Sequence, residues 1–594
     1  MPSSLFNFYK DKINHYDSLI QAVRKKLALT ALGRACSFLG LAVSLYYLYS
    51  SPSWFLSGGV LLFLAGFILL IRWTWRLKES KALWEQLLFV NNNELGLLNR
   101  ELNGFPDGSS LLDGQGYLDD LDIFGKASLF HQLNRTTTSH GQDALSGLLR
   151  QSLQSPSAIR ERQEAIRILT AQVDPRQLLT AKGLIAGEKE GNLHSLTQWL
   201  AGASKLYNQK ALTIARWVLV VYNLVCVGLW MFTDNYKPLL IGVLVAWAFI
   251  GVYGKYINEQ HTLIGKKQAV LDQYAVILNV FNGMDPGDSV LLRELQSRTG
   301  KAYQAIYRLS RLASFFDQRL NVVVNILLNS LFAYDLHCLA ALEKWKVVNR
   351  ESFPDWIKAV GDIECLNSLA AFAFNNPGYA YPEPVSDTVP FIAADKMAHP
   401  LISAKERVAN DLDAGRKERL LLVTGSNMSG KTTFLRTTGV NLLLAQCGAP
   451  VCAASFSFTP MEILTSLRVS DSLQEHTSYF MAELKKLQWI IHRLREGKPS
   501  LVLIDEILRG TNSEDKTYGS EQFIYRLLQL PCLSLFATHD LSLGKLEGER
   551  PGEVSNYCFE SVIEQGELHF NYTLQRGVAR NRNASFLMQK MEII

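Results

Sequence analysis

The sequence lacks the features that define several common protein classes. Its eight cysteines are scattered over 594 residues without a Cys-x-x-Cys pair, so neither a zinc site nor a disulfide scaffold is indicated. The closest two, Cys447 and Cys452, lie in an apolar stretch and are interpreted as buried packing residues. A strong charge is also missing. The 60 basic and 55 acidic residues leave a net charge of +5, too little at this length to indicate a nucleic-acid partner by bulk electrostatics.

Charged residues are also missing from two neighbouring stretches near the N-terminus, 35–49 and 54–71, which are separated by the short turn 50–53. About 20 apolar residues span a bilayer as a helix, so the pair predicts a transmembrane hairpin. A cleavable signal peptide is the alternative, but the apolar run begins too late and a second run follows it. Basic residues flank both sides of the pair and place both ends in the cytoplasm: Arg24, Lys25, Lys26, Arg34, Arg72, Arg76 and Lys78.

A second pair of apolar runs covers 217–232 and 238–253, again with basic residues outside it. These runs are about 16 residues long, a length at which a buried core helix competes with a membrane span. Asn223 is their only clearly polar residue, which leaves little to line a transport path. The pattern favours a second hairpin, and 256–282 is expected either to continue its last helix as a lever or to form a plain structural helix.

A fifth apolar stretch, 322–342, has a different pattern. Asn321, Asn325 and Asn329 recur at helical spacing, and Asp335 follows them. Such a polar stripe predicts a packed cytosolic helix. A fifth crossing would also put the C-terminal region on the opposite side of the membrane from the rest of the body. Four spans are therefore predicted.

The C-terminal third contains a phosphate-binding pattern. A buried strand is predicted at 420–424, the Gly-rich loop 425–432 follows directly, and a helical stretch continues to residue 446. In this strand–loop–helix context the pattern is that of a P-loop, whose backbone N–H groups face nucleotide phosphates. The predicted nucleotide-binding residues of the loop are Gly425, Ser426, Asn427, Met428, Ser429, Gly430, Lys431, Thr432 and Thr433.

Two further predicted strands end in residues suited to ATP hydrolysis with Mg²⁺. The strand 501–504 ends in Asp505 and Glu506, and the strand 533–538 ends in His539. We expect Thr432 and Asp505 to hold Mg²⁺, and Glu506 to polarise the attacking water. His539 is expected to sense the γ-phosphate. ATP and Mg²⁺ are the predicted cofactors, and ATP hydrolysis is the predicted activity.

The residue sequences of these motifs are more specific than the general P-loop pattern. The segments 425–433, 505–512 and 537–540 together resemble the ATPase domain of the MutS family of DNA mismatch repair proteins. The segments 128–141 and 359–382 resemble the opening and the close of the MutS core domain. The resemblance covers about residues 126 to 594, apart from the second hairpin.

The resemblance implies how the site is completed. In that family two ATPase domains pair head to tail, which makes a homodimer the expected assembly. A signature segment from one subunit then completes the partner's site with a serine that meets the partner's γ-phosphate. Ser478 falls at the position of that serine. Arg407 stands where the family often has an aromatic residue that stacks on adenine, and a guanidinium can stack as well.

Features of mismatch recognition are absent from the sequence: nothing before residue 126 resembles that domain, and no Phe-x-Glu wedge occurs there. The first hypothesis is a homodimeric MutS-like ATPase in the cytoplasmic membrane, multi-pass, with its ATPase domain in the cytoplasm and DNA as a candidate partner. A transport ATPase is an alternative, although the Leu-Ser-Gly-Gly-Gln signature is missing. A membrane scaffold that never contacts DNA is the third.

The predicted fold class is multidomain α and α/β: two transmembrane helical hairpins, a helical core and lever domain, and a C-terminal P-loop ATPase of ABC type. So long a chain exceeds what one hydrophobic core organises. The expected units are an N-terminal helix (1–34), the first hairpin (35–71), a linker (72–125), MutS-like core helices (126–210), the second hairpin (211–255), lever and core helices (256–385) and the ATPase domain (386–594).

Overall fold

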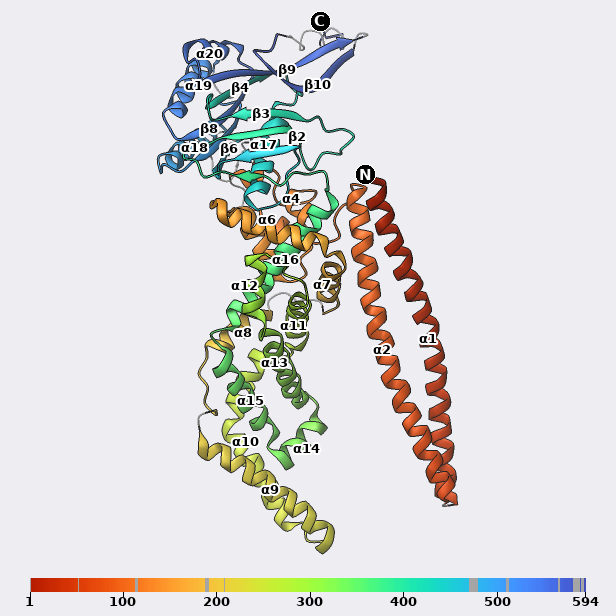
Figure 1. The fold of residues 1–594 in the computed structure, drawn as a ribbon. Helices are drawn as coiled ribbons and strands as arrows, with labels where there is room; N and C mark the ends of the chain where they lie inside the picture. Colours follow the sequence, from red (N-terminus) through yellow and green to blue (C-terminus); the bar gives the residue numbers. More distant parts are fainter. Residues whose placement is uncertain are drawn as a thin grey trace.

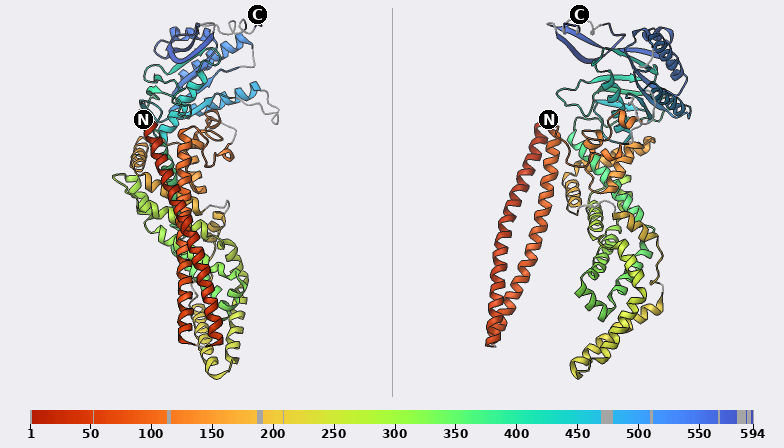
Figure 2. Two further views of the ribbon diagram at one scale, coloured as in Figure 1. Left: turned by 90° about the vertical axis from the view of Figure 1, so that its right-hand side faces the viewer. Right: turned by 180° about the vertical axis from the view of Figure 1, so that it is seen from behind.

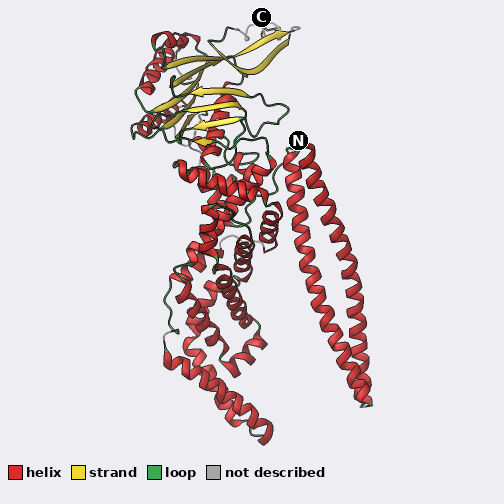
Figure 3. Cartoon of the chain, viewed as in Figure 1, coloured by secondary structure: helices red, strands yellow, loops and turns green. Residues whose placement is uncertain are grey.

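The computed structural model describes the chain except residues 1, 52, 113–115, 187–191, 208, 469–478, 509–511, 565–566, 581–587, 589–591 and 594. The molecule is elongated (Figure 1). All strands lie at one end, and helices make up the rest (Figure 3). Two helical hairpins extend away from the strands, and in two further views their tips lie at the same far end of the molecule (Figure 2).

The first hairpin consists of α1 (Pro2–Ser50) and α2 (Trp54–Leu98), which stand beside the body in Figure 1. The border expected at residue 34 falls inside α1, which is unbroken. A buried polar cluster attaches the base of the hairpin to the body. Arg135 Nη2 lies 2.9 Å from Glu94 Oε2 of α2, and the Tyr9 hydroxyl of α1 donates to Asn375 Oδ1 at 2.7 Å.

The body is helical and is built around α16 (Phe353–Asn375), most of whose residues are buried. Its Glu364 accepts hydrogen bonds from the backbone N–H and the hydroxyl of both Thr137 and Thr138. Burial raises the pKa of Glu364 to about 7. The two segments that resemble the MutS core therefore meet at one carboxyl group. The remaining body helices are α3 (Tyr117–Asp120), α4 (Leu129–Leu133), α5 (Ser139–Arg150), α6 (Pro156–Ala171), α7 (Val173–Ala186), α8 (Asn192–Ala201), α11 (Gln268–Asn282), α12 (Val290–Thr299), α13 (Ala302–Asp317) and α15 (Tyr334–Asn349).

The second hairpin consists of α9 (Lys210–Thr233) and α10 (Lys237–Ile264). By length and composition, four helices of the described chain could cross a membrane: α1, α2, α9 and α10. The expectation that 256–282 forms one helix is wrong, because the chain breaks at 265–267 before α11. Lys266 adopts a positive φ of 58° there, and its N–H is bound by Asp317.

The fifth apolar stretch is not the single packed helix that the sequence suggested. It forms α14 (Val322–Phe332), which is followed by α15 at an angle of 84°. Only part of the asparagine stripe faces the protein: Asn329 is buried and Asn325 is half-buried, whereas Asn321 is exposed and caps the helix by accepting from the Val324 N–H. The other side of α14 exposes its apolar side chains, so the helix is packed on one side only.

The C-terminal part carries two sheets. The larger has the order β10-β9-β4-β8-β7-β6, and all its pairs are parallel except β9 with β10. The smaller has the order β1-β5-β2-β3. Their bounds are β1 (Glu383–Pro384), β2 (Ile392–Met397), β3 (Asn410–Ala414), β4 (Leu420–Gly425), β5 (Ser455–Phe458), β6 (Glu462–Ser466), β7 (Ser500–Asp505), β8 (Cys532–Thr538), β9 (Val554–Glu564) and β10 (Glu567–Arg576). The helices of this part are α17 (Lys431–Gln446), α18 (Tyr479–Leu494), α19 (Ser513–Leu528) and α20 (Leu546–Glu549), and 3-10 turns occur at Ser109–Leu111, Gln318–Leu320 and Leu541–Lys545.

A short segment after the first hairpin docks on this C-terminal part. Buried Asp120 accepts hydrogen bonds from the Thr465 hydroxyl, from the N–H groups at the end of β6 and from Lys486 Nζ. Asp122 binds Arg436 of α17 and Arg468. The segment therefore joins the base of the hairpin to the helix that follows the P-loop.

Candidate nucleotide site

The loop between β4 and α17 has the backbone that a phosphate cradle needs. Gly425 has φ 156° and Gly430 has φ 110°, a region that L side chains rarely adopt. A Cβ atom on Gly425 would lie 2.7 Å from Ser429 Oγ, so the close curl of the loop excludes a side chain there. The loop opens the 16-residue helix α17, whose N-terminal N–H groups and dipole favour an anion.

Lys431 is held over this loop. Its Nζ donates to the carbonyl oxygens of Gly425 and Ser426, each at 2.9 Å, and lies 3.3 Å from His539 Nε2. The ammonium group therefore sits where the ends of β4 and β8 meet. A phosphate in the cradle would replace these neutral carbonyl acceptors with ionised oxygens, which bind the ammonium group more strongly.

Thr432 and Asp505 meet as the sequence predicted for a magnesium site. Thr432 Oγ1 donates to Asp505 Oδ2 at 2.5 Å, which brings two oxygen ligands together at the carboxyl end of the sheet. Among the described residues no group of three His, Cys, Asp or Glu side chains could hold a metal by itself. Two protein oxygens fit Mg²⁺, which completes its shell with nucleotide phosphates and water. The buried Ser429 Oγ also has no hydrogen-bond partner in the described chain, which leaves a donor for a ligand in the loop.

Glu506 follows Asp505 with a positive φ of 53°, and its N–H donates to Ala537 O at 2.9 Å. This turn brings its carboxylate to the mouth of the cradle. There it pairs with Lys516 of α19, a residue that the sequence analysis missed because no motif contains it. An ion pair lowers the tendency of a carboxylate to accept a proton, so Glu506 must leave Lys516 to act as a base.

His539 ends β8 beside Lys431. Burial, followed by the positive charge of Lys431, lowers the pKa of His539 below its ordinary value. The ring is therefore neutral at pH 7, and it can offer one N–H donor to a phosphate oxygen.

Comparison with known proteins identifies the family of the region that contains the P-loop. The family model of MutS domain V matches residues 421–591. The C-terminal region is a MutS domain V ATPase. The prediction of an ATPase is thereby confirmed.

Curated relatives match over the same region. The chain is 35% identical over 243 residues to the DNA mismatch repair protein MSH3 of Meyerozyma guilliermondii, over 39% of this chain and 25% of that protein. It is 35% identical over 232 residues to the DNA mismatch repair protein MutS of Clostridium kluyveri, over 37% and 26%. It is 32% identical over 233 residues to the human MutS protein homolog 4, over 37% and 24%. The chain thus spans about a quarter of the length of each of these relatives.

The predicted residues of domain V line one cavity of about 660 Å³. Of the predicted set, the lining contains Arg407, Asn427, Met428, Ser429, Gly430, Lys431, Thr432, Thr433, Asp505, Glu506 and His539. Gly425 and Ser426 are not among the lining residues, but their carbonyl oxygens accept hydrogen bonds from Lys431, which is. Ser478 lies outside the described residues. Its neighbour α18 contributes Glu483, which accepts from the Leu508 N–H at 2.9 Å and so braces the turn after Glu506.

Arg407, the residue expected to stack on adenine, lines the cavity. Its Nη1 donates to the Tyr379 hydroxyl at 2.9 Å, and its guanidinium lies 5.4 Å from the centre of that ring. Tyr572 of β10, which the sequence analysis missed, also lines the cavity. A Cβ on Gly430 would lie 3.1 Å from its ring. An aromatic residue is therefore present at the site, though from a distant strand that no local pattern connects to the P-loop.

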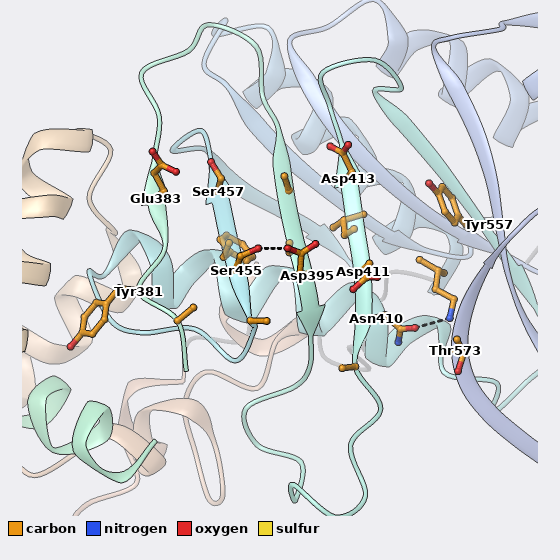
Figure 4. A pocket seen from close by; sticks show the side chains of 18 residues that line it. Tyr381, Glu383, Asp395, Asn410, Asp411, Asp413, Ser455, Ser457, Tyr557 and Thr573 are labelled. Carbon is orange, nitrogen blue, oxygen red and sulfur yellow. Dashed lines mark hydrogen bonds between the residues drawn. The ribbon is translucent and has the colours of Figure 1, made fainter. Parts of the chain in front are cut away.

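The C-terminal part has a second, larger hollow of about 800 Å³ on the smaller sheet, and most of its lining residues precede the region matched by domain V (Figure 4). Glu383, Asp395, Asp411 and Asp413 line it and are exposed, and Ser455 donates to Asp395 at 2.5 Å. Such a surface repels phosphate groups. The acidic lining of this hollow contrasts with the P-loop cavity, where Lys431 supplies a positive charge.

Proposed function

We propose that this chain is an ATPase anchored in the cytoplasmic membrane by two helical hairpins, with domain V in the cytoplasm. The observation that carries the anchoring is the placement of four long apolar helices. Both hairpins extend away from domain V to the same end of the molecule (Figure 2), and little of their apolar surface is covered by protein. One bilayer could cover the apolar surfaces of both hairpins, because both point to the same end of the molecule. In a soluble monomer these surfaces would be exposed to water, which is unfavourable.

In the proposed reaction ATP binds with its phosphates on the P-loop and Lys431. Mg²⁺ held by Thr432 and Asp505 would neutralise charge on the phosphate oxygens. Glu506 orients and polarises the attacking water, and neutral His539 donates to the γ-phosphate. The ATPase cycle drives a conformational switch, and the hairpin-to-α17 connection through Asp122 and Arg436 offers a route by which this switch reaches the membrane helices.

The proposed assembly is a homodimer in which Ser478 of one subunit completes the site of the other. Lys431→Ala and Ser478→Arg proteins should each be inactive, while an equal mixture should recover up to about a quarter of wild-type activity if subunits exchange and sites act independently. A mixture that stays inactive although crosslinking detects heterodimers counts against the shared site. A fully active Ser478→Arg protein refutes it.

The proposed partner is DNA, because two of the named relatives, MSH3 and MutS, are DNA mismatch repair proteins. The second candidate is a membrane scaffold that does not contact DNA, which the acidic face of the smaller sheet favours. Binding of detergent-solubilised protein to homoduplex, mismatched and branched DNA over a salt titration distinguishes the two. Structure-selective binding that weakens with salt supports the DNA role. Its absence for all three DNAs, with ATPase activity retained, supports the scaffold.

A further inference from the structure

The chain around α14 carries no charge between Leu320 and Tyr334. An ion pair brackets this uncharged segment, because Arg319 Nε lies 3.2 Å from Asp335 Oδ2. The segment therefore leaves the charged surface of the body and returns to it at one point. Helix α15 then runs back into the body at 84° to α14.

The outer side of α14 is apolar and exposed. Val322, Val323, Ile326 and Leu327 have exposed fractions of 69%, 66%, 51% and 58%. They recur at helical spacing and form one face, whereas Asn329 near the C-terminal end of the helix is 1% exposed. Four adjacent aliphatic side chains with this exposure need a cover other than water.

The C-terminal end of α14 is joined to the second hairpin by polar contacts. The Asn223 amide of α9 donates to Ser330 O at 3.1 Å and to Leu331 O at 3.3 Å, and Trp247 Nε1 of α10 donates to Ser330 Oγ at 3.0 Å. Asn223 is fully buried. The single clearly polar residue of the hairpin's two apolar runs thus binds the C-terminal carbonyl groups of α14, which no intrahelical N–H reaches.

The break after α14 is also satisfied from within the protein. Ala333 turns the chain with φ 45°, and its N–H donates to Asn329 O at 3.1 Å. The Asn329 side chain accepts from the Asp335 N–H at 2.9 Å. Non-helical backbone is tolerated at membrane depth only where protein groups bind it in this way.

We propose that α14 is embedded in the bilayer, which it enters from the cytoplasmic side and leaves on the same side, and that lipid acyl chains cover its outer face. This inference rests on the proposed membrane anchoring and adds to it an element that does not cross. The occupant follows from continuity, because α14 lies against α9 and α10 (Figure 1), whose own outer side chains, Val225 and Val245 among them, are exposed and apolar. A helix that returns also keeps domain V in the cytoplasm.

Spin labels test the inference in the full chain reconstituted in lipid vesicles. Cys36 is the only exposed cysteine of the described chain, so Cys36→Ser supplies the background for single labels. Labels are placed through Ile326→Cys on α14, Val245→Cys on α10 as the membrane reference, and Gln304→Cys on the exposed side of α13 as the water reference. Collision with oxygen, which concentrates in lipid, is compared with collision with a polar nickel chelate.

The inference predicts that the oxygen-to-nickel ratio at Ile326 matches that at Val245 and exceeds that at Gln304 several-fold. A ratio at Ile326 like that at Gln304, with Val245 still lipid-like, overturns the inference and leaves the anchoring intact. Low collision with both reagents at Ile326 means that protein covers α14 and also overturns it. A water-like ratio at Val245 as well overturns the anchoring itself.

Discussion

In the proposed reaction Lys431 and Glu506 act at different stages of ATP turnover, so their removal should have separable effects. Lys431→Ala removes the charge that the P-loop offers to the β- and γ-phosphates. Loss of charge-assisted hydrogen bonds worth about 1.5–3 kcal/mol each should weaken ATP binding by roughly a hundredfold or more. Titration with a fluorescent ATP analogue measures this, with Lys417→Ala in an exposed loop as the matched control. Unchanged affinity of Lys431→Ala would contradict the assigned role.

Glu506→Gln removes only the carboxylate that polarises water. ATP binding should stay within the wild-type range, while hydrolysis slows by about 10²- to 10⁴-fold, the usual contribution of a general base. Single-turnover hydrolysis measures the chemical step, and Glu514→Gln, exposed at the start of α19, is the control. If Glu506→Gln hydrolyses ATP at the wild-type rate, another group activates the water.

His399 makes the stability of domain V depend on pH. It lines the nucleotide cavity, and its Nδ1 accepts the Leu401 N–H at 3.3 Å, which requires the neutral ring. Burial, with the nearby Arg436 charge, lowers the pKa of His399 to about 4. The folded pKa lies below the unfolded value of about 6.5, so the unfolded chain binds the proton first as the pH falls. Stability is retained above pH 6.5 and is lost between 6.5 and 4.

Lowering the pH from 7.5 to 5 should therefore cost about 2 kcal/mol through His399. This corresponds to a fall in Tm of roughly 4–8 °C for a domain of this size. Thermal unfolding of the solubilised chain at both pH values measures this fall in Tm. In His399→Gln, which cannot titrate at this position, the fall in Tm should be smaller by the amount attributed to His399. Equal dependence in both proteins would mean that His399 is already protonated, or exposed, in the folded state.

At the scale of single residues, chemistry that is local in sequence was predictable. The P-loop and the two carboxylates at a strand end are each formed by neighbouring residues in the sequence, so a local motif identifies them. Thr432 contacts Asp505 as expected. Lys516 and Tyr572 were missed because each reaches the site from an element whose position only the tertiary fold defines.

At the scale of elements, buried strands were the most predictable feature. The apolar runs at 420–424, 501–504 and 533–538 become β4, β7 and β8, since a central parallel strand is apolar on both faces. Breaks between helices were not predictable. Ala333 and Lys266 turn the chain with positive φ, although neither residue type favours that conformation, and Asp317, which binds the Lys266 N–H, lies 51 residues further along the chain.

The segment around α3 offers a test of how the hairpin is coupled to domain V. Asp120→Ala removes the acceptor of the N–H groups after β6 and leaves Lys486 with the Arg468 carbonyl oxygen in place of a carboxylate, which should cost roughly 3–5 kcal/mol of docking energy. Hydrogen exchange in β6 should rise, with exposed Lys126→Ala of the same segment as the control. Unchanged exchange in Asp120→Ala would show that β6 is held without this segment.

At the scale of the whole molecule, the C-terminal ATPase is joined to four long apolar helices of which little is buried by the rest of the protein. Charge asymmetry in the sequence predicted that both hairpins start and end on one side, and their tips lie at one end of the fold (Figure 2). The attachment of the first hairpin could not be predicted, because Tyr9, Glu94 and Arg135 come from segments without a common motif.

The central claim, a membrane-anchored ATPase with its nucleotide site in the cytoplasm, is tested most directly by ATP hydrolysis in sealed membrane vesicles of opposite orientation. Activity that depends on Glu506 is obtained by subtracting the Glu506→Gln protein. We predict that it resists alkaline carbonate extraction, is fully expressed in inside-out vesicles, and appears in right-side-out vesicles only after detergent opens them. Activity that carbonate releases, or that intact right-side-out vesicles show with external ATP, would contradict the account.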